Sequence, residues 1–152
     1  MHLSRRHFLG LTATAPVFAA LGQQAVAASP MIYAEDGIAV DGSDVVGYFT
    51  ESRPVAGDPA ITLDYMGATW RFASVENRSM FEADPKAYTP QYGGYCAFAM
   101  SKGYIAPTIP EAWTIHNGKL YLNFSLRART LWLQDVEGNI AAGDANWPSA
   151  LG

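Results

Sequence analysis

Apolar and polar residues alternate with a period of two on either side of Met66-Gly67, in the stretch ITLDY-MG-ATWRF. If these two residues form the turn, Leu63 lies opposite Trp70, and Ile61 lies opposite Phe72. The apolar side chains of both strands then share one face, and the polar side chains share the other. This agreement between the strands predicts an antiparallel hairpin with one buried face.

A second alternating stretch, WTIH-NG-KLYL, contains the pair Asn117-Gly118, which favours a tight type I′ turn. The register of this hairpin places His116 opposite Lys119, at the tip and on the polar face. Its core face is predicted to consist of five apolar residues: Trp113, Ile115, Leu120, Leu122 and Phe124.

Helix signals lie around the hairpins. Asp44, Ser74 and Ser125 each stand where a side chain can cap the first turn of a helix, and Pro85 begins a short turn through Tyr88. In the last part of the chain, apolar residues follow helical spacing with a kink or a restart, at Trp132, Val136 and Ile140. We therefore expect an α+β fold, a small antiparallel sheet built from two hairpins with three or four short helices packed on it.

The first residues, MHLSRRHFLGLTATAPVFAALGQQAVAA, have a short basic start, a mildly apolar run and an Ala-Val-Ala cleavage pattern. Residues 4–9 resemble the twin-arginine export signal, and an ordinary Sec signal is the alternative. The run is too weakly apolar to hold a membrane span. We expect a signal peptide over 1–27, a loose lead-in over 28–36, a domain over 37–148 and a tail over 149–152. The protein is then periplasmic or secreted, with no stable membrane span after signal removal.

The charge of the chain excludes one class of partner. It has 10 Lys and Arg against 14 Asp and Glu, and removal of Arg5 and Arg6 with the signal changes the net charge from −4 to −6. Binding to phosphate groups needs concentrated positive charge, and no run of basic residues supplies it. Nucleic-acid binding is therefore not expected.

The single cysteine, Cys96, lies in the stretch QYGGYCAFAMSKG. One cysteine excludes an intramolecular disulfide, and an oxidising compartment disfavours an exposed free thiol. Cys96 must therefore be buried, bound to a ligand, paired with another chain or tolerated as a free thiol.

The stretch YMGATWRFASVENRSMFEADPKAY resembles the core of the YHS domain family. The residues that carry this resemblance run from a hairpin through a capped helix to a proline turn: Tyr65, Gly67, Trp70, Phe72, Ser74, Phe81, Asp84-Pro85 and Tyr88. Residues 44–49 (DVVGYF) and 92–97 (YGGYCA) resemble the exported subgroup of that family, in which one such domain follows a signal peptide. The similarity covers about residues 37–148.

The resemblance implies an association with metals, because many YHS domains occur in copper and heavy-metal transport proteins. Those domains place cysteines in the region between the hairpin and the helix. Here Ser74 and Asn77 stand where thiols are expected, and residues 44–46 replace an upstream Pro-Val-Cys-type element. A metal role in this chain must therefore rest on Cys96.

A soft metal such as copper is one ligand that Cys96 could bind. A thiolate and a thioether suit Cu(I), and Cys96 and Met100 are four residues apart, on one face of a helical turn. His116 is the only histidine of the mature chain, but the neighbouring Lys119 would repel a metal ion. The candidate metal ligands are therefore Cys96, Met100 and His116, with His116 the least well placed.

Three other interpretations stay open. In one interpretation Cys96 is a small buried residue of the core, as free cysteines often are. As a nucleophile it would need a base, and only His116 is available. Aromatic residues around a flexible Gly93-Gly94 backbone could instead line a groove for a small ligand or a peptide: Tyr88, Tyr92, Tyr95, Phe98 and Tyr104.

From the sequence we expect an exported binding or accessory module rather than an enzyme. The leading hypothesis is that it binds a soft metal through Cys96, so its partner is a metal ion or a periplasmic protein. The alternative is a module that binds a protein or a small ligand through the Tyr-rich loop around Gly93-Gly94, with Cys96 in the core. A small cysteine-dependent enzyme is the third hypothesis.

Overall fold

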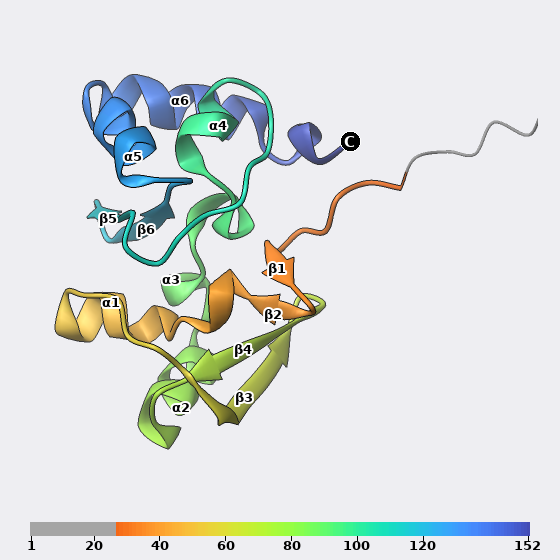
Figure 1. The fold of residues 1–152 in the computed structure, drawn as a ribbon, viewed down its shortest axis with the longest axis vertical. Coiled ribbons are helices and arrows are strands. Elements are labelled where there is room, and N and C mark those ends of the chain that lie inside the picture. Colours follow the sequence, from red (N-terminus) through yellow and green to blue (C-terminus); the bar gives the residue numbers. More distant parts are fainter. Residues whose placement is uncertain (1–26) are drawn as a thin grey trace, which may run out of the picture.

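The fold has two halves, one above the other, in a computed structural model that describes residues 27–152 (Figure 1). The twin-arginine motif therefore lies outside the described residues. The strands are β1 (Ala34–Glu35), β2 (Ile38–Ala39), β3 (Asp58–Tyr65), β4 (Ala68–Phe72), β5 (Trp113–His116) and β6 (Lys119–Leu122). The α-helices are α1 (Val45–Glu51), α2 (Val75–Ala83), α3 (Pro85–Tyr88), α4 (Ala97–Ser101), α5 (Leu126–Leu133) and α6 (Val136–Asn146). The lower half holds β1 to β4 with α1 and α2, and the upper half holds β5, β6 and α4 to α6.

The hairpin of β3 and β4 confirms the first prediction near its turn. Met66 and Gly67 have φ of 50° and 80°, as a type I′ turn requires, and Leu63 pairs with Trp70. The predicted register is wrong at the far end, where Phe72 lies opposite Asp58 instead of Ile61.

A bulge around Pro59 explains this difference in register. Pro59 has no N–H to donate across the sheet, and the Ala60 N–H donates to Asp58 Oδ1 at 2.8 Å instead. The strand order is β1-β2-β4-β3, so β3 is an edge strand, the position in which a sheet tolerates proline. The predicted apolar face still forms, with Trp70 and Phe72 buried.

The segments predicted as a loose lead-in and a tail are ordered parts of the fold. β1 and β2 form a short hairpin, and Ile38 of β2 pairs in parallel with Thr69 of β4. Ile32 is 2% exposed, and the Ser29 N–H donates to Leu151 O at 2.8 Å. Strands of two residues have no alternating pattern long enough to detect, so the sequence did not reveal this hairpin.

The hairpin of β5 and β6 forms with the predicted register, and His116 pairs with Lys119 at its tip. The α+β class is confirmed, with mostly antiparallel strands, but this hairpin does not join the first one, so the described residues form two sheets instead of one. Three of the four residues of β6 are buried, so side chains on both faces of this strand lie in the interior. Tyr121, on the face predicted to be polar, packs against Trp132 of α5 with ring centroids 4.9 Å apart.

Phe124 does not belong to the core face, contrary to the prediction, and is 52% exposed. β6 ends at Leu122, two residues earlier, so the alternation of the strand no longer determines where the ring lies. The Phe124 N–H donates to Cys96 Sγ at 3.2 Å. The backbone of Phe124 is thus held against the core while its ring lies at the surface.

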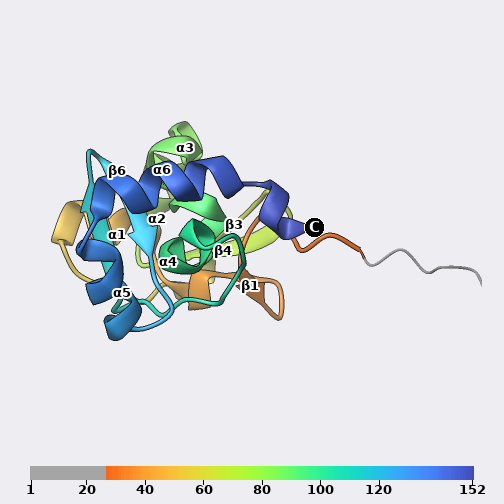
Figure 2. The same ribbon diagram turned by 90° about the horizontal axis from the view of Figure 1, so that it is seen from above.

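The predicted helix caps are confirmed, because Asp44, Ser74 and Ser125 each accept hydrogen bonds from the first turn of a helix. As predicted, the last helical region is interrupted: α5 ends at Leu133, and α6 begins at Val136 with Asp135 as its cap. Figure 2 shows α6 lying beside α4, with which it is in contact. The described residues contain six α-helices rather than three or four, because some have only four or five residues. None of the described helices is long and apolar enough to cross a membrane.

Aromatic side chains form much of the core. Trp70 and Phe72 of β4 each pack against Phe81 of α2, with ring centroids 5.2 Å apart in both pairs. Such pairs add about 1 kcal/mol each beyond the burial of their area. Trp147, after α6, packs against Tyr92, with ring centroids 6.2 Å apart.

Candidate functional site

Cys96 is buried in the upper half, directly before α4, and is 2% exposed. Its sulfur accepts a hydrogen bond from the Ala99 N–H at 3.5 Å and another from the Phe124 N–H at 3.2 Å. Cys96 therefore joins the start of α4 to the segment that follows β6.

The Asn123 side chain completes the surroundings of this sulfur. Asn123 is fully buried, and its Oδ1 accepts a hydrogen bond from the Phe98 N–H at 2.9 Å. The same oxygen accepts a hydrogen bond from the Cys96 thiol, with Sγ 3.4 Å away. Only a protonated cysteine can donate here, whereas a metal ligand or a nucleophile must be a thiolate. The contacts of Cys96 therefore fit a structural thiol.

The other two predicted metal ligands lie on different elements. Met100 is one turn after Cys96, as its spacing predicted, and is fully buried. His116 lies on β5, and its Nε2 is 2.7 Å from Glu137 Oε1 of α6. Within residues 27–152, no three His, Cys, Asp or Glu side chains are grouped so that they could hold a metal. Soft-metal binding by Cys96, Met100 and His116 stays a prediction.

The two segments in which the YHS resemblance would place thiols meet in space. Asp44 Oδ2 accepts hydrogen bonds from Asn77 Nδ2 at 2.7 Å and from the Ala73 N–H at 2.8 Å. Asp44 is fully buried, and its Oδ1 accepts from the Val46 N–H at 3.0 Å. This place is filled by a hydrogen-bonded carboxylate and amide, so it offers a soft metal no sulfur ligand.

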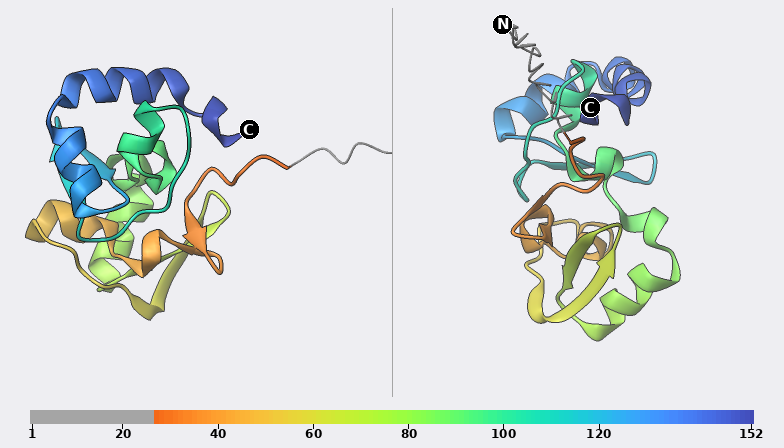
Figure 3. Two further views of the ribbon diagram at one scale, coloured as in Figure 1. Left: turned by 45° about the horizontal axis from the view of Figure 1, so that its top comes forward. Right: turned by 90° about the vertical axis from the view of Figure 1, so that its right-hand side faces the viewer.

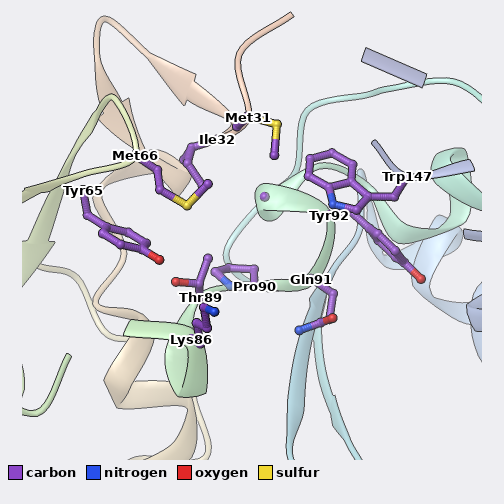
Figure 4. A pocket seen from close by; sticks show the side chains of 11 residues that line it. Met31, Ile32, Tyr65, Met66, Lys86, Thr89, Pro90, Gln91, Tyr92 and Trp147 are labelled. Atoms are coloured by element: carbon purple, nitrogen blue, oxygen red, sulfur yellow. The ribbon is translucent and has the colours of Figure 1, made fainter. Parts of the chain in front are cut away.

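Figure 3 shows, in backbone views, that the two halves of the fold meet. A pocket of about 260 Å³ lies at the Tyr92-Gly93 turn between them (Figure 4). Its walls come from four parts of the chain: the segment before β1, the turn between β3 and β4, the segment from α3 to Gly93, and the residue after α6. The lining residues include Met31, Met66, Lys86, Tyr92, Gly93 and Trp147.

Gly93 shapes this pocket because, without a side chain, its backbone can contact the backbone of Met31. Its φ is 62°, and a Cβ at this position would collide with the carbonyl oxygen of Met31. Its own carbonyl accepts a hydrogen bond from the Tyr33 N–H at 2.9 Å. At Gly94 a Cβ would lie 2.5 Å from Val40 Cγ1. The Gly93-Gly94 backbone is therefore a tightly packed turn, and the expectation of a flexible loop is wrong.

Tyr92 forms the wall of the pocket that belongs to the upper half. Its hydroxyl donates to Asp144 Oδ1 at 3.0 Å. Burial and this neighbouring carboxylate raise the pKa of Tyr92 well above its ordinary value, so the phenol stays neutral. Its ring also contacts Trp147 and is held in place without a ligand.

The remaining walls combine apolar side chains with one charge. Met31 and Met66 are 41% and 47% exposed, and their unbranched thioether chains can adapt to the shape of a ligand. Of the described residues that line the pocket, Lys86 alone is charged. Its ammonium group forms no ion pair with another described residue.

The sequence pointed to Tyr92 and Gly93, which line this pocket, but it did not point to Met31, Met66 or Lys86. Met66 did carry a signal, because a methionine with positive φ in a hairpin turn is unusual and exposes a large apolar side chain. Met31 and Lys86 carried none, since only the tertiary fold brings residues so far apart in sequence to one pocket.

A second pocket of about 230 Å³ lies beside Cys96, and its lining includes Phe98, Tyr104, Phe124 and Ala128. None of the residues that line it is charged, and among the described residues Cys96 Sγ contacts no base. The arrangement gives the hypothesis of a cysteine-dependent enzyme no support.

Comparison with known proteins found no matching family model, no matching curated protein and no matching solved structure. The resemblance to YHS domains therefore stands on the residues of this chain alone.

Proposed function

We propose that this chain is an accessory module that binds a small, largely apolar ligand in the pocket at the Tyr92-Gly93 turn. The observation that carries this proposal is the pocket itself, which lies between the two halves and has exposed methionine and aromatic walls. Small-molecule sites are commonly concave, mostly apolar and furnished with a few polar groups.

The pocket has a fixed part and an adaptable part. Tyr92 and Gly93 are held by hydrogen bonds and close contacts, so ordering them costs little on binding. Met31 and Met66 are free to adjust, and because each is already more than half buried, covering the exposed part of one such side chain contributes about 1 kcal/mol. This combination suits a ligand whose apolar body is covered by the two methionines.

Other features of the sequence bear on where this module acts. The twin-arginine-like start and the resemblance to the exported YHS subgroup support a role outside the cytoplasm. In this proposal Cys96 is a core residue, since its thiol is buried and hydrogen-bonded to Asn123. The pocket, and not the cysteine, is then the place where a ligand binds.

The proposal can be tested with the neutral fluorescent probe N-phenyl-1-naphthylamine, whose emission rises in an apolar site. We expect saturable binding to the protein and about tenfold weaker binding to Met66→Asn, which removes one apolar wall. Asparagine tolerates positive φ, so this variant keeps the turn. Met80→Asn is the matched control, because Met80 is 40% exposed on α2 and does not line the pocket.

Two results would contradict the proposal. One is the absence of saturable probe binding to the unaltered protein. The other is equal weakening by Met66→Asn and Met80→Asn, which would place the bound probe elsewhere or show that it binds without a defined site.

A further inference from the structure

We infer that the ligand of this pocket is an apolar molecule with a single carboxylate, and that Lys86 binds this carboxylate. This inference rests on the proposed function and adds the chemical class of the ligand. It follows from the way in which polar and apolar groups are distributed within the pocket.

The pocket has a polar end and an apolar end (Figure 4). The hydroxyl of Tyr65 and the amine of Lys86 lie toward one end, beside Thr89. The side chains of Met31 and Trp147 lie toward the other end. A ligand that fills the pocket must therefore carry a polar group on one side of an apolar body.

Charge determines which polar group fits best. Lys86 brings one positive charge to the pocket, and within residues 27–152 no carboxylate lines the pocket or pairs with Lys86. The chain as a whole is acidic, with 14 Asp and Glu against 10 Lys and Arg. A group with one negative charge can be neutralised by Lys86, whereas a doubly charged phosphate would meet repulsion from the rest of the protein.

The hydroxyl groups at the polar end support a hydrogen-bond acceptor there. Tyr65 donates no hydrogen bond from its hydroxyl to any described residue, while its ring is fixed against Phe81 with centroids 5.5 Å apart. Thr89 already donates to Pro85 O at 2.7 Å, so its hydroxyl proton is engaged. Tyr65 is therefore the available hydroxyl donor, and a carboxylate can accept from both Tyr65 and Lys86.

A matched pair of compounds tests this inference by titration calorimetry: 4-phenylbutyrate and its neutral amide, 4-phenylbutanamide. We expect the carboxylate to bind about tenfold more tightly, because it adds a charge-assisted hydrogen bond. Lys86→Gln should abolish the preference and leave amide binding unchanged, and Lys86→Arg should keep it. Lys119→Gln is the control, because it removes the same charge from the β5–β6 hairpin.

Each other result has one meaning. Equal binding of the two compounds would overturn the carboxylate inference and leave the proposed function standing. A preference that falls equally in Lys86→Gln and Lys119→Gln would overturn the role of Lys86. If neither compound binds while N-phenyl-1-naphthylamine does, the ligand class is wrong. If none of the three probes binds, the proposed function fails as well.

Discussion

The side-chain oxygen of Asn123 accepts two hydrogen bonds, from the thiol of Cys96 and from the N–H of Phe98, at 3.4 and 2.9 Å. Both donors belong to the start of α4, and Asn123 directly follows β6. The same sulfur accepts from the Phe124 N–H. Hydrogen bonds of Cys96 and Asn123 thus join the start of α4 to the segment that follows β6. This gives Cys96 a structural role that needs no ligand.

Replacement of Cys96 measures this role. Cys96→Ala deprives the Ala99 and Phe124 N–H groups of their acceptor and leaves a small void, so we expect a loss of about 1–3 kcal/mol in the free energy of unfolding. Cys96→Ser keeps a donor and an acceptor and should recover part of that loss. Urea denaturation of the three proteins checks the order. A Cys96→Ala protein as stable as the original would contradict the structural role.

Copper binding is tested separately from stability. A thiol that is buried and bonded to Asn123 must lose its proton and move before it can bind Cu(I). We therefore expect no tight uptake by the reduced protein in a Cu(I) titration against a chromophoric chelator, and the same curve for Cys96→Ser. Stoichiometric uptake that disappears in Cys96→Ser would restore Cys96 as a metal ligand.

The parts of the fold that could be predicted depend on residues close together in the sequence. The turns at Met66-Gly67 and Asn117-Gly118 require positive φ at two adjacent positions, and alternation beside them sets the register. The caps at Asp44, Ser74 and Ser125 depend on one side chain and the next three residues. Such features are readable because their causes are local.

The features that could not be predicted depend on distant residues. The parallel pairing of Ile38 with Thr69 rests on a single register position, and nothing near either residue indicates it. The pocket exists because Met31 and Gly93 touch through their backbones. Sequence patterns favoured Cys96 as the site, since a lone cysteine is conspicuous, while a pocket wall of ordinary Met and Lys residues is not.

Gly93→Ala should show how closely the two halves are joined. The added Cβ collides with the Met31 backbone, and neither segment can rotate away as a side chain would. We expect a loss of more than about 3 kcal/mol in stability, or failure to fold, because a backbone clash adds to the cost of positive φ. Gly118→Ala is the control, since its φ is 73° and no atom lies within 4 Å of the new Cβ.

The two glycine variants can be compared by thermal denaturation. Gly118→Ala should lower the free energy of unfolding by about 1–2 kcal/mol, the strain of a positive φ alone. Similar losses in both variants would mean that the Met31 and Gly93 segments separate easily, and the pocket would then not have a fixed wall.

Because of its buried tyrosines, we expect the protein to lose stability at high pH. Tyr48 is fully buried and donates to Pro110 O at 2.9 Å, and burial raises its pKa from 10.0 to about 12. The folded protein therefore holds this proton more tightly than the unfolded chain does. The resulting stability is complete below pH 10 and is lost as the pH rises toward 12.

We expect the free energy of unfolding, measured in urea from pH 9 to 11.5, to fall with increasing slope. Tyr48→Phe should reduce that slope by up to about 1.4 kcal/mol per pH unit, the effect of one proton, although it lowers stability at pH 7 by about 1 kcal/mol through the lost hydrogen bond. Tyr104→Phe controls for removal of a hydroxyl, because Tyr104 is 55% exposed. Identical slopes for the original protein and Tyr48→Phe would show that folding does not raise the pKa of Tyr48.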